Sequence, residues 1–192
     1  MDRSMWRAII VLCGAGAGGA TLYGPPSGSG RAVAPVPQSV QEPTGARSAL
    51  FVENVGQWPT EDRYVARYGG MIVRTAPGAV LLQLLAGGGD PAQGVLLRLV
   101  FEGAVAGVEP EGEGPLGARL HFFHDDDPSA WKTGARTFAR VRYRELYEGV
   151  DVVLREDGGR AKYDLLLAPA ADLSGVVLRC EGAAGVRVDG DG

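Results

Sequence analysis

The stretch Phe138-Ala139-Arg140-Val141-Arg142-Tyr143 carries the clearest two-residue alternation of apolar and basic side chains in the chain. Successive side chains of a β-strand point to opposite faces, so this alternation predicts a half-buried strand. We expect one face, which includes Val141 and Tyr143, to be buried. Arg140 and Arg142 are expected along the edge of this strand.

Similar runs flank this strand on both sides, and short turn signals separate them. Gly69-Gly70 and Gly158-Gly159 each join two β-rich runs and predict hairpins, and Pro77-Gly78 predicts a further turn. No window shows a sustained helical period, and residues 143–147 could form one helical turn at most. The other expected strands are residues 51–52, 64–68, 71–74, 79–85, 95–101, 120–123, 149–154, 161–167, 176–180 and 186–188.

This spacing of short runs predicts the fold class. Roughly ten short strands separated by turns are typical of an all-β domain, built as an antiparallel β-sandwich or a strongly curved sheet. Residues 109–115 are acidic and glycine-rich, and we expect a flexible insert there. The chain stops at the turn-like run Asp189-Gly190-Asp191-Gly192 with no return strand, so the all-β domain, residues 48–192, is expected to be truncated at its C-terminal end.

The N-terminus has the pattern of an export signal. Arg3 and Arg7 flank the start of a short apolar run that fades into small residues by Ala20, so residues 1–20 are expected to be a cleaved signal peptide. The run is too short and too rich in glycine for a membrane anchor, which needs about 20 apolar residues. The residue before Cys13 is bulky, so plain cleavage is preferred over lipidation of this cysteine.

The next segment, residues 21–47, is rich in proline, glycine and serine. It holds too few large apolar groups to offset the entropy lost on ordering, so we expect a disordered linker. The mature protein is then expected to be exported, either to the cell surface or to the extracellular space, with no membrane insertion after signal cleavage.

Composition excludes two classes of partner. The 192 residues carry a net charge of −4, and loss of Asp2, Arg3 and Arg7 with the signal would shift it to −5. A mildly acidic domain without a basic stripe argues against nucleic acid and anionic membrane surfaces as partners. Cys180 would remain as the single cysteine, in a strand-like run, where a buried apolar role is commoner than a nucleophilic one.

A cluster of histidine and aspartate residues is the strongest candidate for chemistry. His121 and His124 are followed by Asp125, Asp126 and Asp127, whose oxygens could together hold a hard cation such as calcium. The spacing lacks the glycine and the distal glutamate of an EF-hand loop. The structural interpretation, which we prefer, is that Asp127 caps a turn and its neighbours face solvent.

Other carboxylates and the aromatic residues give weaker signals. Asp151 and Asp164 lie on neighbouring expected strands, with Glu53 before them, and paired carboxylates can carry glycosidic acid–base chemistry. No Gly-x-Ser-x-Gly motif marks a nucleophile, so we expect no enzyme activity and no cofactor, with calcium left open. Five large aromatic residues could form a carbohydrate or peptide platform, although burial is commoner for such residues: Trp58, Trp131, Tyr143, Tyr147 and Tyr163.

Four groups of short motifs follow one another in a distinctive order. They are Phe51-Val52-Glu53-Asn54-Val55-Gly56-Gln57-Trp58; Phe122-Phe123 with Asp127-Pro128 and Trp131; Val141-Arg142-Tyr143 with Tyr147-Glu148-Gly149-Val150-Asp151; and Tyr163-Asp164 with Pro169-Ala170-Ala171-Asp172. From about Phe51 to its end the chain therefore resembles the domain of unknown function found near the N-terminus of bacterial exported proteins that carry SBBP-type β-propeller repeats. That family more often has glycine where Ala170 stands, and a less acidic run at residues 124–126.

The resemblance implies an all-β exported module followed by repeats, Ig-like domains or a sorting region, and it implies no catalytic residues. We therefore expect a non-enzymatic extracellular β-domain that acts as a structural or interaction module ahead of repeat domains in a larger exported protein. Its expected partners are downstream β-propeller or Ig-like repeats of the same protein, and a surface glycan or protein ligand. The alternative is a carbohydrate- or calcium-binding module that uses the Asp125–Asp127 loop and exposed aromatics.

Overall fold

The computed structural model describes residues 7–11, 50–68, 70–85, 94–124 and 126–183. The predicted linker, the predicted strand 186–188 and most of the predicted signal peptide lie outside the described residues. Within the described part, no helix is long and apolar enough to cross a membrane.

The described residues form one antiparallel sheet, which confirms the all-β prediction. The strands are β1 (Arg7–Val11), β2 (Phe51–Glu53), β3 (Tyr64–Tyr68), β4 (Met71–Ala76), β5 (Ala79–Leu84), β6 (Val95–Glu102), β7 (Pro110–Phe122), β8 (Lys132–Tyr147), β9 (Val150–Asp157), β10 (Arg160–Leu167) and β11 (Val177–Glu181), with a short 3-10 helix η2 (Pro128–Ala130) between β7 and β8. Their order in the sheet is β1-β10-β9-β8-β2-β3-β4-β5-β6-β11, and β7 pairs with β8 off this path.

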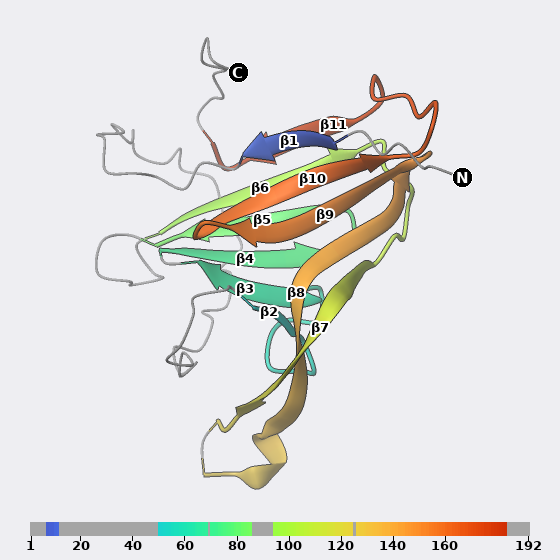
Figure 1. The fold of residues 1–192 in the computed structure, drawn as a ribbon. Coiled ribbons are helices and arrows are strands. Elements are labelled where there is room, and N and C mark those ends of the chain that lie inside the picture. Colours follow the sequence, from blue (N-terminus) through green and yellow to red (C-terminus); the bar gives the residue numbers. More distant parts are fainter. Residues whose placement is uncertain (1–6, 12–49, 69, 86–93, 125, 184–192) are drawn as a thin grey trace.

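The sheet curls strongly into a half-barrel, so that β8 to β10 pass over β4 to β6 (Figure 1). This is the strongly curved alternative of the predicted fold class. The two halves face each other across one hydrophobic core, to which β4, β5, β6, β8, β9 and β10 all contribute buried side chains. Val141 and Tyr143 of β8 are fully buried in it, as their alternation predicts.

All three predicted turns join neighbouring strands. β3 and β4 pair antiparallel up to Tyr68 and Met71, on either side of the predicted Gly69-Gly70 turn, of which Gly69 lies outside the described residues; Gly158-Gly159 links β9 to β10 in unbroken antiparallel register. Both glycines of the second pair have positive φ, 60° and 79°, a region that costs other residues free energy. Pro77-Gly78 links β4 to β5, and its glycine has a φ of 66°.

A second, smaller hydrophobic cluster covers the outer face of the sheet around β3 and β4. It buries Ile72 on this face of β4, a strand whose six residues are all buried. Trp58, from the loop after β2, packs edge-on against Phe122 of β7, with ring centroids 5.4 Å apart. The cluster consists of Val52, Trp58, Val65, Ile72, Phe122 and Ala135.

Two sequence predictions about local structure are wrong. Residues 110–115, predicted to be a flexible insert, form the first half of β7 and pair with β8. Residues 143–147, where one helical turn was allowed, form the end of β8 with an irregular register between Tyr143 and Tyr147. Glu145 takes a φ of 47° at this bulge, so the chain leaves the strand geometry for one residue without entering a helix.

Candidate functional site

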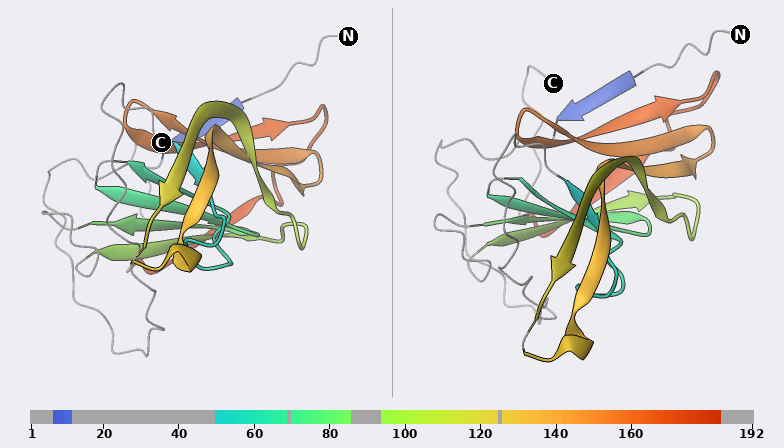
Figure 2. Two further views of the ribbon diagram at one scale, coloured as in Figure 1. Left: turned by 90° about the horizontal axis from the view of Figure 1, so that it is seen from below. Right: turned by 60° about the horizontal axis from the view of Figure 1, so that its bottom comes forward.

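The hairpin of β7 and β8 extends well beyond the body of the half-barrel. These are the longest strands of the described sheet, with 13 and 16 residues, and the hairpin tip projects away from the other strands in Figure 1 and in the right view of Figure 2. The tip is closed by the helix η2.

The hairpin tip carries an exposed aromatic cluster of three side chains. Phe123 is 60% exposed and Trp131 is 39% exposed. Their rings meet edge to face, with centroids 5.0 Å apart and an interplanar angle of 84°. His121, two residues before Phe123 and on the same side of the chain, lies parallel to it with centroids 6.2 Å apart. We call His121, Phe123 and Trp131 the tip cluster.

The predicted calcium loop lies beside the tip cluster. Asp127 is the N-cap of η2: its Oδ1 accepts from the backbone N–H of Ser129 at 2.9 Å and its Oδ2 accepts from the Ser129 hydroxyl at 2.8 Å. These bonds to Ser129 lower the pKa of Asp127. Asp126 is exposed, and Asp125 lies outside the described residues. Within the described part, no three His, Cys, Asp or Glu side chains gather as a metal site would need, so calcium binding stays a prediction.

Of the five aromatic residues weighed as a ligand platform, only Trp131 is available at the surface. Tyr143, Tyr147 and Tyr163 belong to the main core, and Trp58 belongs to the outer cluster. Phe123 is the exposed ring that sequence reasoning missed. Its signal was its place in the alternation of residues 120–123, which puts it on the opposite face from Phe122.

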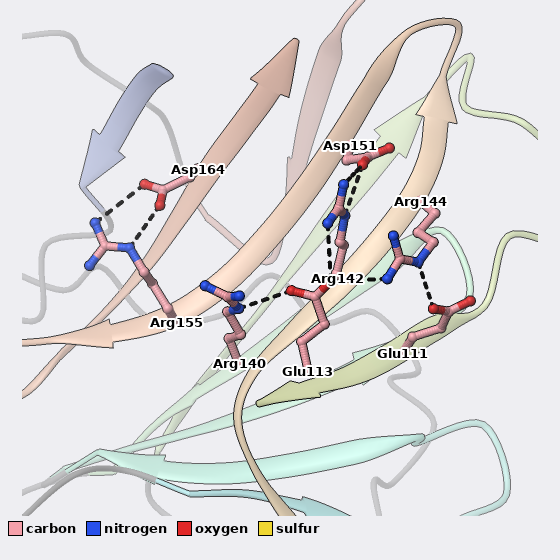
Figure 3. Close-up of polar contacts among 8 residues, drawn as sticks. All are labelled: Glu111, Glu113, Arg140, Arg142, Arg144, Asp151, Arg155 and Asp164. Atoms are coloured by element: carbon pink, nitrogen blue, oxygen red, sulfur yellow. Dashed lines mark hydrogen bonds and ion pairs between the residues drawn. The ribbon is translucent and has the colours of Figure 1, made fainter. Parts of the chain in front are cut away.

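A network of ion pairs that the sequence pattern did not predict lies on the outer face of β7, β8 and β9. Glu113 lies among three arginines, because Arg140, Arg142 and Arg144 approach its carboxylate at 2.9 Å, 3.0 Å and 3.0 Å (Figure 3). Arg144 also pairs with Glu111 at 2.8 Å. Burial alone would raise the pKa of Glu113, but the hydrogen bond and charge of Arg142 and the neighbouring arginines outweigh it and lower that pKa.

Both aspartates that could have formed a catalytic pair have arginine partners of their own. Asp151 accepts hydrogen bonds from Arg142 and from the backbone N–H of Glu145. Asp164 is buried and accepts from Arg155 at 2.7 Å (Figure 3). The oxygens that acid–base chemistry would require are thus engaged in holding β8, β9 and β10 together.

The first motif of the chain organises the loop that follows β2. Asn54 donates through Nδ2 toward the carbonyls of Trp58, Pro59 and Asp62, at 3.2 Å, 2.8 Å and 2.7 Å. Its Oδ1 accepts from the N–H groups of Gly56 and Trp58. This side chain therefore fixes the loop that places Trp58 on the outer cluster.

Neighbouring motif residues secure the same region. Gln57 donates to the Glu53 carbonyl at 2.7 Å. Glu53 forms a two-pronged pair with Arg136 at 2.6 Å and 2.8 Å, which ties β2 to β8. Gly56 has a φ of 105°, and a Cβ there would lie 3.3 Å from the Lys132 side chain.

The motif tyrosines connect the two halves of the barrel. The Tyr143 hydroxyl lies 3.0 Å from the carbonyl oxygens of both Ala76 and Ala79, at the turn between β4 and β5. The Tyr147 hydroxyl lies 3.0 Å from the carbonyl of Glu102 and 3.2 Å from that of Val177. Each phenol thus crosses from β8 to the opposite wall.

A further charged pair is buried in the fold. Arg74 of β4 and Asp62 are each 2% exposed, and Nη1 of the arginine lies 3.7 Å from Oδ2 of the aspartate. Arg74 also donates to Gln83 at 2.7 Å. Burial raises the pKa of Asp62 and lowers that of Arg74, and each charge opposes the shift of the other.

The described part of the chain is an all-β half-barrel in which most of the motif residues build the fold, while the tip cluster lies exposed at the end of the β7–β8 hairpin. It belongs to the family DUF7948, a domain of unknown function, whose profile matches residues 51–192. No curated protein and no solved structure matches the chain.

Proposed function

We propose that this domain is a non-enzymatic contact module of an exported protein, and that it binds a protein partner through the tip cluster. The observation that carries the proposal is the exposure of Phe123 and Trp131 at the end of a protruding hairpin. Large apolar side chains that fold formation does not bury are typical of contact sites, and tryptophan is enriched among the residues that dominate binding energy.

The engagement of the acidic residues supports a binding role over a catalytic one. Asp151 and Asp164 are each paired with an arginine and positioned within the sheet. A general acid or base needs an oxygen that can approach a substrate and exchange a proton with it. In this fold the carboxylate oxygens of Asp151 and Asp164 instead form ion pairs between neighbouring strands.

The partner class follows from the shape of the tip cluster. Phe123 and Trp131 present rings at 84° to each other, a wedge rather than a flat surface. A wedge suits a pocket on another protein better than the flat apolar face of a sugar ring. From the family resemblance, we propose that the pocket lies on a β-propeller or Ig-like repeat of the same exported protein.

Carbohydrate binding is the second candidate, and one observation favours it. The exposed Asp126 and the η2 cap Asp127 lie in the same connection between β7 and β8 as Phe123 and Trp131, so this connection carries both carboxylates, which can accept hydrogen bonds from hydroxyl groups, and exposed aromatic rings. This combination is common in sugar sites, which pair stacking with a few polar contacts.

Site-specific photo-crosslinking in the cells that export the protein tests the proposal. A benzophenone side chain at position 123 should give a discrete protein adduct, and Trp131→Ser should reduce its yield. The same group at Val105, which is 53% exposed on the barrel body, is the matched control and should give no such adduct. Equal adducts from both positions, or none from position 123, would contradict a protein contact at the tip. Binding to a glycan panel that is lost in Phe123→Ser would support the second candidate instead.

A further inference from the structure

The outer edge of β10 is the structural feature that the proposed function does not use. β10 pairs with β9 over its whole length, from Arg160 to Leu167, with no shift of register. On its other side it pairs antiparallel with β1, from Lys162 to Leu166. An extended segment from a distant part of the chain therefore already occupies this edge.

The edge lacks the features that usually protect a terminal strand from pairing. Natural sheets block such edges with proline, bulges or unpaired charges, above all lysine. β10 contains no proline and no bulge, and within the stretch that β1 covers both charged residues are paired inside the sheet: Lys162 with Asp157, and Asp164 with Arg155. Its inward residues, including Tyr163 and Leu165, are held in the core, so the strand is rigid.

The segment that occupies the edge is one that the sequence marks for removal. β1 lies in the apolar run of the predicted signal peptide, and its last four residues, Ala8 to Val11, are uncharged. We propose that the edge of β10 is a strand-acceptor site. Once residues 1–20 have been cleaved, a short uncharged strand of a different protein pairs antiparallel with it along Lys162–Leu166. Main-chain hydrogen bonds supply the affinity in this kind of recognition.

The geometry specifies which backbone groups form that ladder. A two-residue hairpin loop closes on a hydrogen-bonded pair, here Asp157 and Arg160, and hydrogen-bonded pairs alternate along the strands. The even-numbered residues of β10 thus face β9, and the N–H of Ala168, next along the chain, does donate to the Gly149 carbonyl. The amides of Tyr163 and Leu165 are therefore directed at the acceptor edge.

Two proline variants of the full chain test this arrangement. Tyr163 and Leu165 lie opposite Ile10 and Ala8. Ala8→Pro/Ile10→Pro removes the two β1 amides that face β10, whereas Arg7→Pro/Ile9→Pro places prolines where the amides face away, a position that edge strands tolerate. NMR-detected hydrogen exchange at the amides of residues 163 and 165 should be at least about tenfold faster in the first variant than in the second.

A peptide added in trans then tests the acceptor property itself. A synthetic peptide that copies residues 5–12 should restore slow exchange at residues 163 and 165 of the Ala8→Pro/Ile10→Pro chain, in a saturable manner. N-methylation of the peptide at Ala8 and Ile10 should weaken binding at least about tenfold, because it removes two ladder donors. N-methylation at Arg7 and Ile9 keeps those donors and is the matched control.

Three results would overturn the proposal. Exchange at residues 163 and 165 that is equally slow in both proline variants would show that β1 does not cover the edge. Failure of the peptide to bind the opened chain would show that the edge accepts no strand. Protection that grows with protein concentration, without peptide, would assign the edge to a second copy of this chain instead.

Discussion

Single side chains with several hydrogen bonds account for much of the local structure in this domain. Asn54 shapes the loop after β2, and Asp151 holds both the Arg142 guanidinium and the bulge residue Glu145. The Tyr143 hydroxyl reaches the turn between β4 and β5. Their partners come from loops and strands far along the chain, which explains why these motif residues serve the fold.

Asn54→Ala should destabilise the fold more than the substitution of a single polar residue usually does. It removes partners from three carbonyls and two N–H groups in a half-buried loop, and each lost hydrogen bond contributes about 0.5–1.5 kcal/mol. We expect a loss of roughly 2–4 kcal/mol in the free energy of unfolding, measured by urea denaturation. Thr60→Ala, at an exposed residue of the same loop, is the control and should change it little. A loss under about 0.5 kcal/mol for Asn54→Ala would refute this account.

Ala170 occupies a backbone conformation that suits glycine. Its φ is 65°, and the residue is exposed, so a glycine would relieve strain without opening a cavity. We expect Ala170→Gly to stabilise the domain by about 0.5–1 kcal/mol, since the left-handed region costs an alanine roughly 1–2 kcal/mol and the greater chain entropy of glycine offsets part of it. Thermal unfolding would measure this. Ala168 does not have a positive φ, so Ala168→Gly is the control and should lower the unfolding midpoint. If Ala170→Gly lowered the midpoint as well, residue 170 would not be strained.

Among the strands, β7 is one whose first half could not be predicted from its own residues. Its first half contains Glu111, Gly112, Glu113 and Gly114, residues with poor strand propensity. The pairing is favoured instead by the arginines of β8 opposite it and by a close approach at Gly112, where a Cβ would lie 2.6 Å from the Phe138 ring. Both causes lie in the partner strand β8, so the sequence of β7 alone does not reveal them.

Gly112→Ala should therefore destabilise the hairpin base. The added methyl group would overlap the buried Phe138 ring, and overpacking of this kind costs roughly 1–3 kcal/mol. Gly117→Ala, also on β7, meets no atom within 4 Å and is the matched control. Thermal unfolding of both variants decides the point: equal midpoints would show that no close contact exists at residue 112.

The ion pair between Glu53 of β2 and Arg136 of β8 makes the stability of the fold depend on pH. The hydrogen bond from Arg136 lowers the pKa of Glu53 from its ordinary value of 4.5. A carboxyl group whose pKa is lower in the folded state stabilises the fold at pH values above its unfolded-state pKa. This stabilisation is lost as the pH falls through its folded-state pKa. Glu53→Gln should therefore flatten the fall of the unfolding midpoint between about pH 5 and about pH 3. An unchanged slope would show that the pair does not contribute.

For the whole molecule, the alternation of residues 138–143 and the Gly158-Gly159 turn predict β8, the β9–β10 hairpin and the all-β class, and the structure confirms these three predictions. The choice between a sandwich and a strongly curved sheet, and the packing of Trp58 on the outer cluster, were not predictable in this way. They depend on which faces meet after folding, as with Tyr143 and its carbonyl partners from residues 76 and 79. For the same reason the sequence offered Asp151 and Asp164 as a pair, while the structure gives each its own arginine.

The central claim is that the tip cluster serves contact and not folding, and thermal unfolding of the full chain with Phe123→Ser/Trp131→Ser tests it most directly. These rings are exposed and pack on each other at the end of the hairpin, so the account predicts an unfolding midpoint within about 2 °C of the wild type. The Tyr143→Phe variant, which loses a buried hydrogen bond, should fall by more than that. A fall for the double variant as large as that of Tyr143→Phe would contradict the claim, because the cluster would then be part of the folded core.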